Sequence, residues 1–437
     1  MFALIAVALA EAPKLDVGGD VKSFFVAGFP RPWFGLSDSS VALLEAAGLT
    51  EDEALDLYGL DAEPYAQGVV SARVKAAATW GPARLDVHWA GAAETLGRDA
   101  IVGLGTGAGL SAPELLPLTW APDAGDLGLR HRLDRLVLSA KLPHVDVALG
   151  RQPVSFGSGR FFTPMDLVNP FHPATIDTEY KPGVDALRVD AYAGVSTKFT
   201  AVAAWAGQPV LGDDAREDGP ILDDLVLAAT GQVTVGITDL SVFVGDVHAE
   251  PVFGLGVVSG LGPVGVHADA TLTVPEDEDV FVRAVAGADG RPTETTTITG
   301  ELYLQSFGAT DPADYLDAVD DPRFTRGELW QMGQLYAAVA VVQEITPLIH
   351  VNASVISNLR DPSALVTLGG AWSVADNADV VFGGYLGVGE GTDIVELDLD
   401  PLTGGVVPPT DAVLAESVNS EFGLYPAMAY VQVRAYF

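Results

Sequence analysis

The end of the chain alternates strictly between apolar and polar side chains. Val431, Val433 and Phe437 fall on one face of the alternation, and Gln432 and Arg434 fall on the other. A period of two residues is typical of a β-strand with one apolar and one polar face. The pattern predicts that the chain closes on an amphipathic strand whose last residue is aromatic.

The same alternation recurs along the whole sequence and predicts an all-β protein. Residues 70–80 and 84–89 both alternate, and only Gly81-Pro82 separates them, a dipeptide typical of a tight turn. We predict about eighteen strands (16–18), each close to the roughly 9–11 residues that a tilted strand needs to cross a membrane. They cover residues 15–27, 67–80, 83–93, 129–142, 145–153, 183–193, 197–206, 223–235, 239–248, 251–260, 263–274, 279–286, 296–308, 329–343, 348–358, 363–373, 378–388 and 423–437.

The links between these strands differ in length in a regular way. Links of a few residues alternate with long ones, and a soluble β-sandwich has no reason to sort its loops in this way. Short turns on one rim and long loops on the other are typical of outer-membrane barrels. We therefore predict an antiparallel transmembrane β-barrel with short periplasmic turns and long extracellular loops. The long links cover residues 28–66, 94–128, 154–182, 207–222, 309–328 and 389–422.

The start of the chain and its hydropathy agree with this prediction. Residues 1–10 are apolar and end on Ala8-Leu9-Ala10, which is similar to a cleaved secretory signal, although no basic residue precedes the apolar run. The mean hydropathy is +0.28, yet we find no apolar run of the roughly 18 residues that a membrane-spanning helix needs. Only helices or closed barrels satisfy the backbone in lipid. We expect residues 11–437 to form a single barrel domain.

Composition narrows the functions that this barrel can have. The net charge of −36 argues against nucleic acid as a partner, because a phosphate-binding surface must be basic. The absence of cysteine excludes disulfides, thiol catalysis and cysteine-ligated metal. The acidic excess reflects either a composition bias of the genome or a cation-attracting mouth. We expect no cofactor, with Ca²⁺ or bridged lipopolysaccharide at the acidic external loops as an open alternative.

The densest polar segment carries a family resemblance. Gly150-Arg-Gln, the turn Phe156-Gly-Ser-Gly-Arg160 and Asp166-Leu-Val-Asn-Pro-Phe171 resemble bacterial outer-membrane porin-like barrels. The glycine-containing turn lacks the strand-to-helix context of a phosphate-binding loop, so we exclude nucleotide binding. The resemblance implies that the third long loop folds inward and narrows the lumen, and that a carboxy-terminal strand ending on Tyr436 and Phe437 is recognised by the barrel-assembly machinery.

On this basis we predict a pore constriction that opposes acid and base. A narrow gap between opposite charges aligns water and polar solutes and disfavours apolar ones. The alternative is that the same residues form ion pairs that rigidify an inward loop. The candidates are Asp166, Asp177 and Glu179 on the acidic side, Arg73, Lys75 and Arg84 on the facing strands, and Arg151, Arg160 and Arg188 beside the loop.

Other motifs give weaker expectations. Thr50 and Glu53 have the spacing of a helix capping box, and Asp311-Pro312 is typical of a helix start. His267 and Asp269 share a strand face, and such a pair is the reason to keep a barrel hydrolase as an alternative. Five tryptophans near strand ends suggest an aromatic belt at the membrane interfaces: Trp80, Trp89, Trp205, Trp330 and Trp372.

The function that we predict is passive diffusion of small polar or charged solutes across the outer membrane of a Gram-negative bacterium. An acidic mouth predicts a preference for cations. A second hypothesis is a non-transporting barrel that anchors or partners a surface complex. We predict no enzyme activity, and the sequence leaves the solute and the oligomeric state open.

Overall fold

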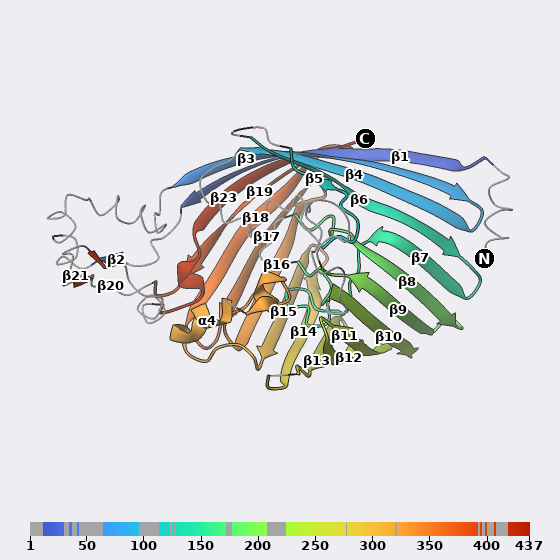
Figure 1. Cartoon of the computed structure of the whole chain (residues 1–437). Helices are drawn as coiled ribbons and strands as arrows, with labels where there is room; N and C mark the ends of the chain where they lie inside the picture. The colour runs from blue at the N-terminus through green and yellow to red at the C-terminus, as the bar shows by residue number, and fades with distance from the viewer. Residues whose placement is uncertain are drawn as a thin grey trace.

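The chain folds into a closed antiparallel β-barrel (Figure 1). Eighteen strands form the ring, each paired with the next one along the chain, and the first strand also pairs with the last. This computed structural model describes residues 12–29, 35–36, 42, 64–95, 113–122, 125, 127–171, 177–207, 224–276, 278–319, 321–391, 394–395, 398–399, 406–407 and 418–437.

Each of the eighteen predicted strand ranges overlaps one strand of the ring, which confirms the predicted fold class. The barrel strands are β1 (Lys14–Phe29), β3 (Tyr65–Trp80), β4 (Ala83–Thr95), β6 (Leu127–Lys141), β7 (Val145–Gln152), β8 (Val184–Ala193), β9 (Thr197–Trp205), β10 (Leu225–Val235), β11 (Thr238–Val247), β12 (Glu250–Leu261), β13 (Val264–Thr273), β14 (Phe281–Thr293), β15 (Thr296–Gln305), β16 (Leu335–Thr346), β17 (Ile349–Asn358), β18 (Ser363–Ala375), β19 (Ala378–Val388) and β23 (Ala427–Tyr436).

Two strand boundaries differ most from the prediction. β14 continues to Thr293 rather than ending near 286, and its register with β13 pairs Gly287 with His267, where a Cβ would lie 2.5 Å from the His267 ring. β16 begins at Leu335 rather than at 329, because residues 329–334 belong to the preceding loop, where Leu329 is buried.

The barrel closes where β1 lies between β23 and β3. The register pairs Asp20 with Tyr436 and Phe29 with Ala427, so β23 runs antiparallel to β1 along most of its length. The backbone of Phe437 exchanges two hydrogen bonds with Gly19, at 2.9 and 3.0 Å. The chain therefore ends at the rim that carries the short turns.

Loop lengths follow the predicted asymmetry. Eight links on one rim have two or three residues, at 81–82, 142–144, 194–196, 236–237, 262–263, 294–295, 347–348 and 376–377. The links on the other rim include the long segments, and also one two-residue turn, His248-Ala249, whose φ angles of 52° and 64° suit a tight hairpin.

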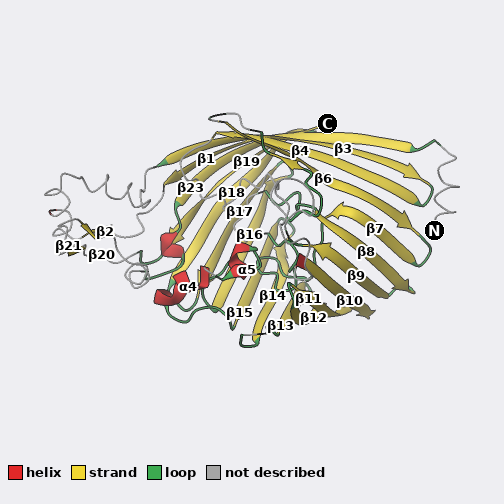
Figure 2. Ribbon diagram, in the orientation of Figure 1, coloured by secondary structure: helices red, strands yellow, loops and turns green. Residues whose placement is uncertain are grey.

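Short helices and two-residue strands lie in the links between the barrel strands (Figure 2). The Asp311 carboxylate accepts a hydrogen bond of 3.1 Å from the Ala313 N–H, which confirms the predicted helix start. Among the residues that the structure describes, no helix is long and apolar enough to cross a membrane. The elements are η2 (Pro312–Asp314), α4 (Tyr315–Val319), α5 (Pro322–Thr325), η3 (Phe422–Leu424) and the two-residue strands β2 (Gly35–Leu36), β5 (Thr119–Trp120), β20 (Ile394–Val395), β21 (Asp398–Leu399) and β22 (Val406–Val407).

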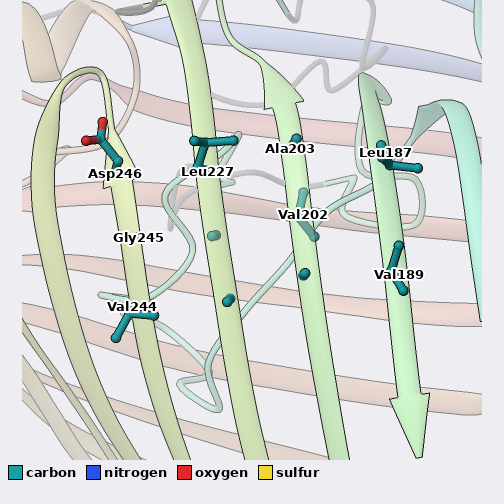
Figure 3. Close-up of a pocket in the computed structure, with 11 residues that line it drawn as sticks. Leu187, Val189, Val202, Ala203, Leu227, Val244, Gly245 and Asp246 are labelled. Atoms are coloured by element: carbon teal, nitrogen blue, oxygen red, sulfur yellow. The ribbon is translucent and has the colours of Figure 1, made fainter. Parts of the chain in front are cut away.

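The two faces of the wall differ in polarity. On β23, Val431 and Val433 are exposed on the outer face, whereas Gln432 is buried on the inner face. The outer face carries a shallow apolar groove of about 570 Å³ across β8 to β11, where Leu187 on β8 and Leu227 on β10 stand on either side of β9 (Figure 3). An apolar outer face and a polar inner face are the arrangement that a membrane barrel requires.

The tryptophans of the predicted aromatic belt lie in different surroundings, and some predicted segments lie outside the described residues. Trp89 and Trp372 are exposed on the outer face, but Trp205 is buried and Trp330 lies in the β15–β16 loop. The predicted leader at 1–10 and the capping box at 50–53 lie outside the described residues, as do the acidic runs at 213–214 and 51–53.

Candidate pore constriction

The link between β7 and β8, residues 153–183, folds into the barrel, and we call it the inward loop. Its described residues are 153–171 and 177–183. One part of the loop contacts inner side chains of β13 and β15, and another part contacts β1, β3, β6 and β23. The inward loop therefore joins separate parts of the wall across the lumen.

Two carboxylates of the wall hold the tip of the inward loop. Asp269 on β13 accepts hydrogen bonds from the Ser158 N–H, from the Ser158 hydroxyl at 3.0 Å and from the Gly159 N–H at 3.2 Å. Glu301 on β15 accepts from the next three backbone N–H groups, those of residues 160–162, with the two from Phe161 and Phe162 at 2.9 and 3.1 Å. Hydrogen bonds to a charged acceptor are stronger than neutral ones.

The glycines of the tip make this geometry possible. Gly157 has a φ of +91°, and a Cβ on Gly159 would lie 1.8 Å from the Phe162 carbonyl oxygen. Successive N–H groups of such a turn converge on one anion. In this chain the anions that bind these N–H groups are the carboxylates of Asp269 and Glu301 in the barrel wall.

Aromatic side chains pack behind the tip. The Phe162 ring stacks on Tyr303 with a centroid distance of 4.7 Å and an interplanar angle of 7°. Phe162 also contacts the Tyr336 ring at 6.0 Å. All three side chains are buried, so the tip is fixed by apolar packing as well as by hydrogen bonds.

Residues 177–183 of the inward loop lead back to β8, and we call them the returning limb. Its carboxylates form ion pairs with a lysine of the barrel wall. The Lys22 ammonium on β1 lies 2.7 Å from Asp177 and 2.8 Å from Glu179. Gln432 on β23 donates to Asp177 at 3.1 Å. Burial alone would raise the pKa of Asp177, but the ion pair with Lys22, the charge of Arg434 and the hydrogen bond from Gln432 together lower it.

Tyr180 lies at the centre of this contact. Three cationic groups surround its ring: the Arg73 guanidinium at 4.4 Å, the Lys75 ammonium at 4.9 Å and the Lys22 ammonium at 5.1 Å from the centroid. Lys75 also donates to the Tyr180 hydroxyl at 2.6 Å. Burial and the neighbouring Glu179 raise the pKa of Tyr180, so the phenol stays neutral and its ring attracts the cations.

A second group of charged residues, around Asp134 and Lys181, adjoins the contact around Tyr180 through Arg73 and the inward loop. Asp134 on β6 is buried, pairs with Arg73 and Arg135, and accepts a hydrogen bond of 3.1 Å from the Gly183 N–H. Within the loop, the Lys181 ammonium lies 2.6 Å from Asp166. These bonds fix both the wall and the base of the returning limb.

Comparison with known proteins finds solved structures with the same architecture. No family model and no curated protein matches the sequence. Among solved structures, Acinetobacter baumannii OccAB4 superimposes with a TM-score of 0.52 at 5% identity, over 98% of this chain and 99% of that chain. A BenF-like porin from Pseudomonas fluorescens Pf-5 gives a TM-score of 0.51 at 9% identity, over 97% of this chain and 98% of that chain. Pseudomonas aeruginosa OpdK with vanillate gives a TM-score of 0.51 at 10% identity, over 97% of this chain and 98% of that chain.

The chain has the fold of an outer-membrane porin. The match extends over nearly the whole length of both chains, so it includes the ring and the order of its strands. At identities of 5–10% the match shows the fold alone, so the roles of the side chains in this barrel are inferred from their own contacts.

Five of the predicted constriction residues lie at the inward loop inside the barrel. Arg73 and Lys75 contact the Tyr180 ring, and Asp177 and Glu179 on either side of Tyr180 in the loop form ion pairs with Lys22. Asp166 lies in the same loop in its ion pair with Lys181. The cavity between the returning limb and β1, β3 and β4 measures about 20 Å³, close to the space that one water molecule needs.

The other four predicted residues lie elsewhere. Arg84 is exposed and pairs at 2.7 Å with Asp86 on its own strand, and Arg188 pairs at 2.9 Å with its strand neighbour Asp190. The Arg160 guanidinium is 60% exposed and lies 3.9 Å from Asp289, although the Arg160 backbone N–H donates to Glu301 at the loop tip.

Arg151 is fully buried in a cluster of its own. Its guanidinium lies 3.0 Å from Glu114 and 2.7 Å from Asp185. It also donates to the Leu116 carbonyl at 2.9 Å. The cluster joins the segment 113–122 to β7 and β8, and the Arg151 side chain has no exposed surface.

Sequence reasoning missed several residues of the constriction. Lys22 follows from strand periodicity, because it shares the inner face with Asp20 and Phe24. Asp134 lies where β6 shifts register against β4, so periodicity alone could not place it. Glu301 and Asp269 gave no signal in sequence that they hold the inward loop.

Proposed function

We propose that the protein is a porin-like channel of the Gram-negative outer membrane, which lets small polar or charged solutes diffuse passively past the inward loop. The observation that carries this proposal is the contact around Tyr180, where the acidic limb of a loop inside a closed barrel meets three wall cations. Polar groups of both signs at a narrow passage favour hydrated polar solutes over apolar ones.

We further propose that the channel prefers cations. The chain has 59 acidic and 23 basic residues, and the cations at the constriction are matched by carboxylates, as Lys22 is by Asp177 and Glu179. An unmatched acidic excess raises the local concentration of cations at a mouth. We therefore expect the selectivity to follow the charge at the constriction and at the mouth formed by the long loops.

Reconstitution in planar bilayers under a KCl gradient tests both parts. We expect stepwise conductance and a reversal potential of the sign set by K⁺. Lys75→Gln should shift the reversal potential further toward K⁺, because Lys75 is the partly exposed cation beside Tyr180. Lys14→Gln, at the end of β1 on the short-turn rim, is the matched control and should leave it unchanged. Anion selectivity would contradict the preference and leave the channel itself standing.

A non-transporting barrel is the second candidate. The observation in its favour is that the returning limb is bonded to the wall, with only about 20 Å³ between them at Tyr180. Correctly folded protein without any conductance would select this candidate. We propose no enzyme activity for either candidate; the Nε2 of His267 lies 2.7 Å from Glu301, which also accepts the N–H groups of the loop tip.

We also propose that the carboxy-terminal aromatic residues serve assembly. Deleting Phe437 should lower the yield of folded barrel in the outer membrane, because the residue supplies both backbone hydrogen bonds to Gly19 at the seam and the terminal aromatic ring. Tyr436→Phe is the control, since it keeps an aromatic ring and removes only the hydroxyl that lies 3.2 Å from Glu179. Heat-dependent mobility of the membrane fraction in gels measures the folded fraction. Equal yields for the deletion and the control would contradict the proposal.

A further inference from the structure

Three links on the rim of the long loops meet at a buried pair of carboxylates, Asp361 and Glu421. Glu421, in the β19–β23 link, accepts hydrogen bonds from the Tyr336 hydroxyl, from the Asn358 amide at 2.8 Å and from the Met332 N–H at 3.2 Å. Both carboxylates are buried, with 1% and 2% of the surface of Glu421 and Asp361 exposed.

Asp361, in the β17–β18 link, shares the Asn358 amide with Glu421 and has further donors of its own, among them the Ser363 hydroxyl. It accepts from the Tyr315 hydroxyl at 2.6 Å, from the Glu421 N–H at 2.8 Å and from the Asn358 amide at 3.2 Å. The Asn358 amide nitrogen thus bridges the two carboxylates. We call these residues the rim cluster: Tyr315, Tyr336, Asn358, Asp361 and Glu421.

The rim cluster holds two acids and no base. The groups that face Glu421 are Asp361 from the β17–β18 link, Tyr336 from β16 and Tyr315 from the β15–β16 link. Tyr425 of its own link adds another phenol. Among the described residues, no lysine, arginine or histidine forms an ion pair with either carboxylate. Two negative charges in one dry site repel each other strongly.

Burial and the charge of Asp361 raise the pKa of Glu421 to about 7. Geometry points the same way, because the two buried carboxylates share the Asn358 amide as a donor and a proton on one of them removes the repulsion between their charges. One proton shared by two acids is a recurrent solution for such pairs.

The rim cluster also connects to the inward loop. Tyr336 gives its hydroxyl to Glu421, and its ring contacts Phe162 of the loop tip at 6.0 Å. Phe422, the residue after Glu421, packs against the other side of the Tyr336 ring at 6.4 Å. A change at Glu421 therefore reaches the loop tip through a single side chain.

We propose that Glu421 and Asp361 form a proton-binding site that locks the three links and the inward loop when one proton is bound. The ligand is H⁺, and the site is distinct from the constriction around Tyr180. An effect of this site on transport would rest on the proposed channel function. Binding of the proton and ordering of the links do not depend on conductance.

The direction of the effect follows from linkage. The pKa of Glu421 is raised in the folded protein above the value of about 4.5 expected in the unfolded chain. The stabilisation is therefore complete below about pH 4.5 and is lost as the pH rises toward about 7, where the folded site gives up its proton. The links are locked in acid and loosened in neutral to alkaline solution.

Hydrogen exchange of the full-length folded barrel at about pH 5.5 and about pH 8.5 tests the site, after correction for intrinsic exchange rates. We expect protection of segments 329–334 and 418–424 to fall about tenfold or more across this range. Glu421→Gln, which resembles the protonated acid, should keep both segments protected at both pH values. Glu294→Gln, in an exposed turn on the opposite rim, should behave like the unaltered protein.

Asp361→Asn provides a second arm in case Glu421→Gln does not fold. Removing the Asp361 charge should lower the pH at which protection is lost. Unchanged protection across the pH range in the unaltered protein would overturn the proposal, as would the same loss in Glu421→Gln. Loss of conductance steps alone would count against the proposed channel and would leave the proton site untouched.

Discussion

Single-channel conductance is expected to rise when Glu301 is replaced by alanine. The carboxylate accepts hydrogen bonds from three successive backbone N–H groups of the loop tip and contacts the His267 ring. Hydrogen bonds to a charged group contribute about 1.5–3 kcal/mol each, so their loss should increase the open population of the tip by roughly a hundredfold or more. A tip released from β15 no longer crosses the lumen.

The measurement is planar-bilayer conductance combined with hydrogen exchange of residues 156–162. Asp269→Ala should act in the same direction with a smaller effect, because it leaves the contacts of residues 160–162 in place. Glu344→Ala, near the short turns and outside the loop contacts, serves as the control. A conductance and an exchange pattern like those of the control would show that the tip is held by its aromatic packing alone.

The largest loss of stability is expected from Asp134→Ala. The Asp134 carboxylate has no exposed surface and pairs with both Arg73 and Arg135, so its removal leaves two buried guanidinium groups without their acid. Breaking a buried ion pair from one side costs about 3–5 kcal/mol. The Gly183 N–H also loses its acceptor, which loosens the base of the inward loop.

Denaturant unfolding of the barrel in detergent, followed by mobility in gels, measures this change. Asp86→Ala is the matched control, because the Arg84–Asp86 pair is exposed and such pairs contribute about 0–1 kcal/mol. A shift for Asp134→Ala no larger than for Asp86→Ala would mean that Arg73 is satisfied by the Tyr180 ring instead.

Strand positions and faces were predictable because both are local properties of the sequence. Side chains alternate across a strand, so Arg73 and Lys75 on β3 could be placed on the inner face from their neighbours alone. Loop lengths then gave the two rims. The same argument places Gln432 inside and Val431 outside, as the structure confirms.

The partners of these residues were less predictable because they depend on long-range geometry. The carboxylate of Glu301 lies about 140 positions along the chain from the loop tip that it binds. Arg151 shows how a long-range contact decides a role that local sequence suggested. It lies in β7, paired with Leu136 on β6 and Asp185 on β8, and its guanidinium binds Glu114 and Asp185. Its side chain is buried beneath the segment 113–122 instead of entering the lumen.

The seam between β1 and β23 has a consequence for how the barrel forms. Every other pairing in the ring joins strands that follow each other along the chain, whereas this one joins Asp20 to Tyr436. Contacts between distant positions are slow to form because the intervening chain must be ordered first. Until the last strand is made, β1 has an unpaired edge, and such edges invite association with other chains. We therefore expect the seam to close late in folding, after the strands between β1 and β23 are ordered.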